Sequence, residues 1–246
     1  MLAVVRLLLI AVFVIVSTLT GLVVCVFRPF NADNVVLFGR WYAWCGRLLG
    51  VDVEVRHHPD VPAAQPCVFT ANHQNNYDLF LMPHALLQRT VTIGKKSLRL
   101  IPFFGQLYWL SGNILLDRDN RSRAVGTMQG AVGRIQREQL SVWMFPEGTR
   151  SYGRGLLPFK TGAFHIAQQA KVPVVPVCMS STQHIRLNRW RNGKVIIEMM
   201  APIELSERTP IRPFAREVRG LMEEKLAELD TELASDYTAQ SLTARN

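Results

Sequence analysis

The sequence predicts an α/β fold, a mixed sheet flanked by helices, preceded by an N-terminal membrane-embedded helical segment. Strand-like and helix-like runs alternate through most of the chain, as in a sheet covered by helices. Residues 7–27 carry no charged side chain, which is long enough for a helix to cross a hydrocarbon core of about 30 Å. We expect a membrane anchor and interfacial segment at 1–50, one large domain at 51–234, and a flexible polar tail at 235–246.

The N-terminal segment is expected to stay attached, because Gly21–Arg28 offers no small-x-small cleavage site. Arg6 precedes the apolar run, and most of the flanking arginines follow it, which favours a cytoplasmic main domain at a bacterial inner membrane. The stretch 35–51 mixes aromatic residues with arginines, a composition typical of the headgroup interface. It either lies along the bilayer or completes a re-entrant pair with the first segment.

The main domain begins with an alternating strand pattern at 51–55, followed by a proline-rich loop. Short apolar runs bounded by turn residues then alternate with longer amphipathic runs. We expect strands at 67–70, 90–94, 114–116, 141–145, 172–177 and 195–199, and helices at 77–87, 121–138, 163–171 and 213–233.

The positive charge is concentrated in the middle of the chain. The net charge is +9, and residues 89–194 alone hold 17 basic and four acidic side chains. Such an excess suits a phosphate-bearing ligand, an anionic membrane or a nucleic acid. Nucleic acid is disfavoured, because the basic residues come singly between apolar runs and no nucleic-acid-binding motif is present. The four cysteines lie far apart with no C-x-x-C pair, so we expect reduced structural thiols and no metal site.

His73 and Asp78 follow a buried strand and are the first candidates for chemistry. On one ideal helix they would point about 140° apart, so they must straddle a turn between a strand and a helix. A carboxylate on one imidazole nitrogen fixes the tautomer and leaves the other nitrogen to accept a proton. By spacing alone, an Asn-rich turn capped by an aspartate explains the pattern equally well.

Two further clusters follow strands. Phe145–Ser151 combines a glycine, Glu147 and Arg150, which suits close backbone approach and binding of hydroxyls and phosphate. Gly112–Arg118 ends in another arginine, although a surface ion pair would account for it equally well. No serine or cysteine lies in a nucleophile elbow, so direct attack by a substrate hydroxyl is the simplest mechanism.

Taken together, these clusters resemble four ordered blocks of a known family. The blocks are Asn72–Asp78, Gly112–Arg118, Phe145–Arg150 and Val172–Val177. The chain resembles the bacterial 1-acyl-sn-glycerol-3-phosphate (lysophosphatidic acid) acyltransferases of the glycerolipid acyltransferase family over about residues 65–200. One histidine and aspartate at this spacing is a weak signal, whereas four blocks in order is a strong one.

The resemblance implies that an acyl group moves from acyl-CoA or acyl carrier protein to the sn-2 hydroxyl of a lysophospholipid, giving phosphatidic acid without cofactor or metal. It assigns His73 as the general base and Asp78 as its orienting partner. Backbone N–H groups near Gly148 or the first helix are candidates for the oxyanion donors. Candidate acceptor-binding residues are Arg118, Glu147, Gly148, Thr149 and Arg150, with Lys95, Lys96 and Lys160 as a possible phosphate or donor field.

Three alternatives stay open from the sequence. The same base could activate water in a membrane thioesterase or lipid hydrolase, the acceptor could be another lyso-lipid, and the chain could be a non-catalytic protein that binds lipids or a partner. Acyl-chain length, the choice of donor and the oligomeric state leave no signature in the sequence.

Overall fold

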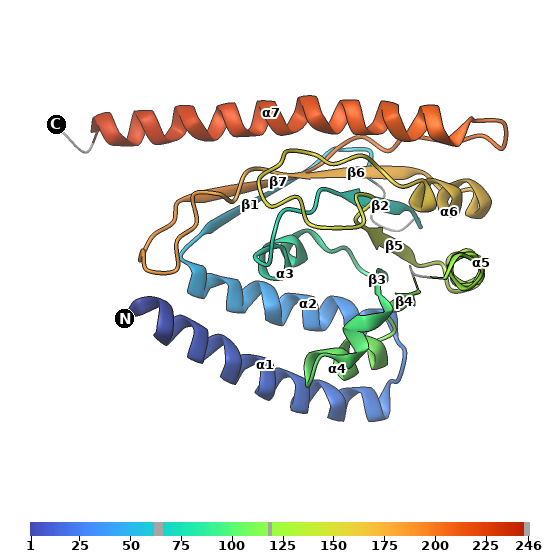
Figure 1. The fold of residues 1–246 in the computed structure, drawn as a ribbon, viewed down its shortest axis with the longest axis horizontal. Helices are drawn as coiled ribbons and strands as arrows, with labels where there is room; N and C mark the ends of the chain where they lie inside the picture. Colours follow the sequence, from blue (N-terminus) through green and yellow to red (C-terminus); the bar gives the residue numbers. More distant parts are fainter. Residues whose placement is uncertain (62–65, 118–119, 244–246) are drawn as a thin grey trace.

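A mixed sheet of seven strands forms the centre of the computed structural model, which describes residues 1–61, 66–117 and 120–243 (Figure 1). The strand order is β1-β7-β6-β2-β5-β3-β4. Five consecutive strands, from β6 to the edge strand β4, run parallel to one another, whereas β1 and β7 run antiparallel to them. The strands are β1 (Asp52–His57), β2 (Val68–Ala71), β3 (Thr90–Lys95), β4 (Ile114–Leu116), β5 (Ser141–Met144), β6 (Val174–Met179) and β7 (Lys194–Met199).

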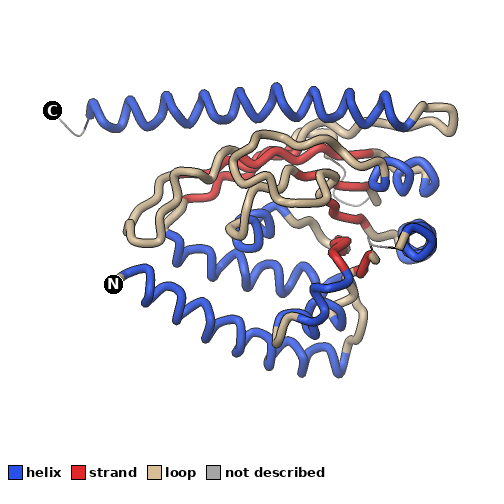
Figure 2. The backbone as a smooth tube through the Cα atoms, in the orientation of Figure 1, coloured by secondary structure: helices blue, strands red, loops and turns tan. Residues whose placement is uncertain are grey.

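Helices cover both faces of this sheet (Figure 2). Because side chains alternate along a strand, Val68 joins the core on one face and Phe69 joins the core on the other. The first face packs on α5 (Arg121–Glu138), α6 (Gly162–Ala170) and α7 (Ile211–Thr243). The second face packs on α2 (Ala32–Gly46) and α3 (Asp78–Leu81).

The helix α1 (Leu2–Phe27) lies outside α2 and is apolar and largely exposed (Figure 1). Among the described residues it is the one helix long and apolar enough to cross a membrane by length and composition. Its first turn is nevertheless fixed to the sheet domain. The guanidinium of Arg6, 4% exposed, donates to the carbonyls of Leu187, Arg189 and Trp190 at 2.9, 2.6 and 3.0 Å.

The far end of α1 also contacts the domain. It packs on α4 (Phe104–Leu110), and the N–H of Phe30, just beyond α1, donates to the carbonyl of Leu110 at 2.8 Å. Both ends of α1 therefore contact one domain, and α1 also packs on α2.

Most predicted elements are present, with shifts at their ends. The helix at 121–138 and the strand at 114–116 have the predicted bounds. The helix expected over 77–87 is shorter, because α3 gives way to a tighter turn over Met82–Ala85 that has a proline near its start. The last helix continues to Thr243, through most of the segment expected to be a flexible tail.

Candidate active site

The turn between β2 and α3 brings two titratable side chains together. His73 follows β2, and Asp78 is the first residue of α3. The Nδ1 atom of His73 lies 2.6 Å from Oδ2 of Asp78. The aspartate side chain is 3% exposed and the histidine side chain 18%. The pair is therefore held inside the protein while the imidazole still reaches its surface.

The hydrogen bonds of Asp78 determine which imidazole nitrogen can take a proton. Its Oδ2 atom also accepts the backbone N–H groups of Gln74, at 2.7 Å, and Asn75, at 3.3 Å. Because Oδ2 of Asp78 acts as an acceptor toward these N–H groups, we assign the proton between the two side chains to Nδ1 of His73. In the neutral imidazole Nε2 is then unprotonated and can act as a base.

A rigid frame behind the turn holds it in place. The side-chain amide of Asn72 bonds the backbone of Met179 in both directions, at 2.9 and 2.8 Å. Gln74 donates to the carbonyls of Met179 and Ser180 and accepts from Thr182. These contacts tie the turn to the end of β6, more than one hundred residues away in sequence. The position of His73 thus depends on long-range bonds as well as on the local turn.

The segment after β5 supports the imidazole from its other side. The ring of Phe145 stacks on that of His73, with centroids 4.1 Å apart and an interplanar angle of 20°. The N–H of Ser151 donates to the carbonyl of His73 at 2.8 Å. The 145–151 segment therefore fixes both the ring and the backbone of the histidine.

Glu147 is buried in this segment and bonds backbone groups with both oxygens. Oε1 accepts the N–H of His73 at 2.6 Å, and Oε2 accepts the N–H of Leu157 at 2.9 Å. Burial raises the pKa of this carboxyl group above its ordinary value, although the two N–H donors work in the opposite direction. Its contacts are those of a clamp between two loops. The glycerol-binding role implied by the family resemblance stays a prediction.

Two cationic side chains lie beside the clamp. Gly148 has φ +72°, a backbone conformation that favours glycine, and a Cβ there would lie 2.8 Å from Cε of Lys160. Lys160 thus passes over Gly148, next to the residue that holds His73. The Nε atom of Arg150 is buried and has no hydrogen-bond partner among the described residues. An anion at this position would satisfy it.

The other predicted site residues are placed differently. Thr149 is exposed on the same loop as Arg150. Lys95 is exposed at the end of β3, separated from β2 by β5. Arg118 lies outside the described residues. Gly148 is not an available oxyanion donor, because its N–H donates to the carbonyl of Phe145 at 3.0 Å within the turn. The other N–H groups near Gly148 and those of the first helix stay candidates for the oxyanion donors.

The described cysteines and acidic or histidine side chains form no second nucleophilic or metal-binding cluster. All four cysteines are free and buried, and burial raises the pKa of Cys67 to about 12. No group of three or more His, Cys, Asp or Glu side chains that could hold a metal ion occurs among the described residues. Burial also lowers the pKa of His84 and of His184, away from the site. The described chemistry is thus concentrated at His73.

Comparison with known proteins agrees with this arrangement. Residues 52–180 match the family model described as Acyltransferase. The chain is 48% identical over 242 residues to the 1-acyl-sn-glycerol-3-phosphate acyltransferase of Escherichia coli, covering 97% of this chain and 99% of that one. It is 48% identical to the protein of the same name from Haemophilus influenzae, over 95% and 99% of the two chains.

More distant relatives preserve the likeness. The human 1-acyl-sn-glycerol-3-phosphate acyltransferase alpha is 35% identical over 85% of this chain and 76% of its own. The crystal structure of the 1-acyl-sn-glycerophosphate (LPA) acyltransferase PlsC from Thermotoga maritima superposes with a TM-score of 0.72. At 23% identity, covering 93% and 94% of the chains, it establishes the shared fold. The chain therefore belongs to the acyltransferase family.

Proposed function

We propose that this enzyme transfers a fatty acyl group from a thioester donor to the sn-2 hydroxyl of 1-acyl-sn-glycerol-3-phosphate, giving phosphatidic acid. The observation that carries the proposal is the position of His73. Its Nδ1 is bonded to a buried carboxylate at 2.6 Å, which leaves Nε2 as the nitrogen that can accept a proton, and two cationic side chains lie on the adjoining loop. A base beside a phosphate-binding loop suits an acceptor that carries both a hydroxyl and a phosphate.

In this mechanism Nε2 of His73 takes the proton of the acceptor hydroxyl as its oxygen attacks the thioester carbonyl. The imidazolium that forms is stabilised by Asp78, whose Oδ1 is buried and has no partner among the described residues. The carbon–sulfur bond then breaks, and the departing thiolate takes the proton from Nε2. The products are an ester and a free thiol, and His73 is neutral again.

Arg150 and Lys160 would bind the acceptor phosphate. In a glycerol phosphate the phosphate lies only a few bonds from the sn-2 hydroxyl, so its binding site must adjoin the base. The loop after β5 meets this condition, because Glu147 and Ser151 both bond the backbone of His73. Holding the two reactants in this geometry supplies much of the rate enhancement.

The amino-terminal helices would embed the enzyme in one leaflet. The exposed apolar side chains of α1 face away from the domain, while Arg6 and Phe30 connect its two ends to it. The enzyme would therefore lie on the bilayer that contains its acceptor. By the distribution of arginines, the domain is expected on the cytoplasmic face of a bacterial inner membrane. A protease-protection assay on inverted vesicles tests this, because protection of a C-terminal tag would contradict it.

The reaction is tested with the purified full chain and radiolabelled acyl-CoA, with and without lysophosphatidic acid. We expect labelled phosphatidic acid only when the acceptor is present. Lysophosphatidylcholine and lysophosphatidylethanolamine serve as matched acceptors that differ in the head group. Free fatty acid as the main product in every sample would show a hydrolase instead.

A further inference from the structure

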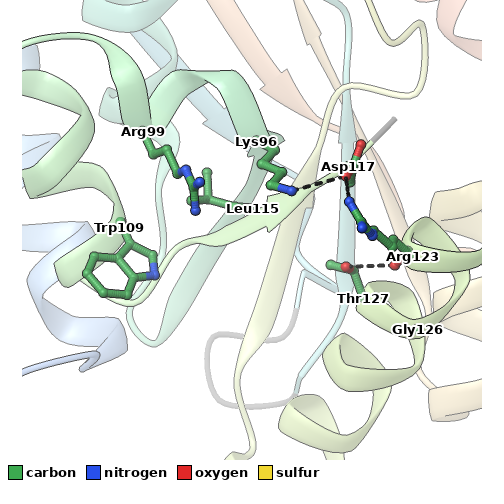
Figure 3. Close-up of a pocket in the computed structure, with 8 residues that line it drawn as sticks. All are labelled: Lys96, Arg99, Trp109, Leu115, Asp117, Arg123, Gly126 and Thr127. Carbon is green, nitrogen blue, oxygen red and sulfur yellow. Dashed lines mark hydrogen bonds and ion pairs between the residues drawn. The ribbon is translucent and has the colours of Figure 1, made fainter. Parts of the chain in front are cut away.

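A second basic site lies at the end of β4 (Figure 3). We call it the β4–α5 pocket. Its volume is about 540 Å³, within the roughly 300 to 1,000 Å³ of small-molecule sites. It opens between the turn Lys96–Leu100, α4 and the first two turns of α5. The charged and aromatic side chains that line it are Lys96, Arg99, Trp109, Asp117 and Arg123.

The pocket has more positive than negative charge. Lys96 Nζ and Arg123 Nη1 lie 3.2 and 3.5 Å from the same oxygen of Asp117, Oδ2. Arg99 is exposed on the opposite wall, and no described carboxylate forms an ion pair with it. Three cations against one carboxylate make a favourable position for a ligand with several phosphate oxygens.

The remaining walls suit a flat aromatic group. The indole of Trp109 is 49% exposed and is braced edge-on by Phe30, with centroids 5.3 Å apart. On α5, a Cβ added at Gly126 would meet nothing within 4 Å, so this side of the pocket is open. A fixed aromatic ring beside open space and arginines is the arrangement on which a nucleobase stacks.

The sheet determines how far this pocket lies from the base. His73 follows β2 and Asp117 follows β4, with β5 and β3 between them. Three strand spacings of about 4.8 Å place the two strand ends roughly 14 Å apart. Phe69 is level with Trp143 and Thr92, and Lys95 is level with Leu116. The two strand ends are therefore at the same height, and the separation runs across the sheet.

We propose that the β4–α5 pocket binds the nucleotide end of an acyl-CoA donor; this rests on the proposed transfer from a thioester. The acceptor phosphate cannot serve both sites, because it must lie within a few bonds of the hydroxyl at His73. In acyl-CoA the long pantetheine arm separates the thioester from its phosphates and adenine. A carrier protein would bring one phosphate and an acidic surface, but no base to stack on Trp109.

A direct measurement of CoA binding tests the proposal without relying on catalysis. Calorimetry with the detergent-solubilised full chain would measure the affinity for free CoA. We expect the double variant Arg99→Gln, Arg123→Gln to bind CoA at least about tenfold more weakly than the wild type. The control, Arg208→Gln with Arg212→Gln, removes the same charge from exposed positions just before α7 and in its first turn, and should bind normally. Equal affinity in both double variants would overturn the proposal.

Variants of Trp109 and the kinetics of transfer show which part of the donor binds in the pocket. Trp109→Ala should weaken CoA binding, whereas Trp109→Phe, which keeps a ring, should retain most of it. In the transfer assay, the Arg99 and Arg123 double variant should raise KM for acyl-CoA and leave KM for the lyso-lipid unchanged. A raised KM for the lyso-lipid alone would assign the pocket to the acceptor. The proposal would also be overturned if the wild-type protein bound acyl carrier protein but not CoA. If the wild-type protein bound CoA but transferred no acyl group, only the proposed reaction would be contradicted.

Discussion

The ends of β2 and β4 lie on one edge of the same sheet but are built in opposite ways. At the end of β2, the backbone N–H groups of His73 and Gln74 and the Nδ1 atom of His73 are all bonded to buried carboxylates. At the end of β4, Arg99 and Arg123 reach into solvent around a single carboxylate. Proton transfer requires fixed geometry, whereas a hydrated phosphate can be bound by cations that adjust to it. We therefore assign the chemical step to the end of β2 and donor binding to the end of β4.

The largest expected effect is on kcat, from changes to the His73–Asp78 pair at the end of β2. His73→Ala should lower kcat by roughly 10² to 10⁴-fold, because it removes the general base. Asp78→Asn should lower it by a similar factor, since an amide no longer holds the imidazole in the same tautomer. Single-turnover rates measure the chemical step. Wild-type turnover by His73→Ala, in a preparation free of other acyltransferases, would contradict the assignment.

The next effect separates the two phosphate-binding regions. Arg150→Gln should raise KM for the lyso-lipid by roughly 10 to 100-fold, as expected for losing hydrogen bonds to a charged group. It should leave KM for acyl-CoA unchanged, the reverse of the pattern predicted for Arg99 and Arg123. If both groups of variants changed the same KM, the division between the two strand ends would be wrong.

A smaller effect is expected on stability. Glu147→Gln should lower the free energy of unfolding by about 1 to 3 kcal/mol, because an amide can accept only one of the two backbone N–H bonds. The pKa of Glu147 is raised in the folded state, so its protonated form is favoured by folding. The stability of the wild type relative to the variant should therefore increase as pH falls from the raised folded pKa toward the ordinary value of 4.5. Thermal unfolding at several pH values measures this, and a difference that shrinks on acidification would contradict it.

The smallest effect concerns the ring that supports His73. Phe145→Leu removes a face-to-face contact of about 0.5 to 1.5 kcal/mol and should lower kcat by several-fold at most. Phe145→Tyr, which keeps the ring, is the matched control. A loss as large as that of His73→Ala would mean that Phe145 does more than orient the imidazole.

The fold and the His73 turn were predictable because their signals are local. Buried strands such as 114–116 are short apolar runs, and the histidine and aspartate lie five positions apart at a strand end. The clamp by Glu147 was not predictable from spacing, because it joins residues 74 positions apart. Nor was α4, which begins after Phe103, a residue whose φ of +65° is unusual for a non-glycine residue.

The β4–α5 pocket was missed for a related reason. Its aromatic wall comes from α4, and its charges come from the Lys96–Leu100 turn, the end of β4 and α5. Lys96 and the block that contains Asp117 were candidates from the sequence, but Arg99, Trp109 and Arg123 were not. The sequence showed that the region around 89–194 is basic, but not which cations would meet. Only the order of the strands shows that Asp117 lies well away from His73.

The bonds of Arg6 affect the order in which the enzyme is assembled. Arg6 leaves the ribosome near the start of synthesis, but its partner Leu187 lies 181 residues later. At typical translation rates this is a delay of roughly 10 to 40 s. During that time the arginine lacks the three carbonyls that satisfy it in the folded protein. The far end of α1 can pack on α2 and α4 earlier, but the Arg6 end can dock only after the 187–190 segment has been made.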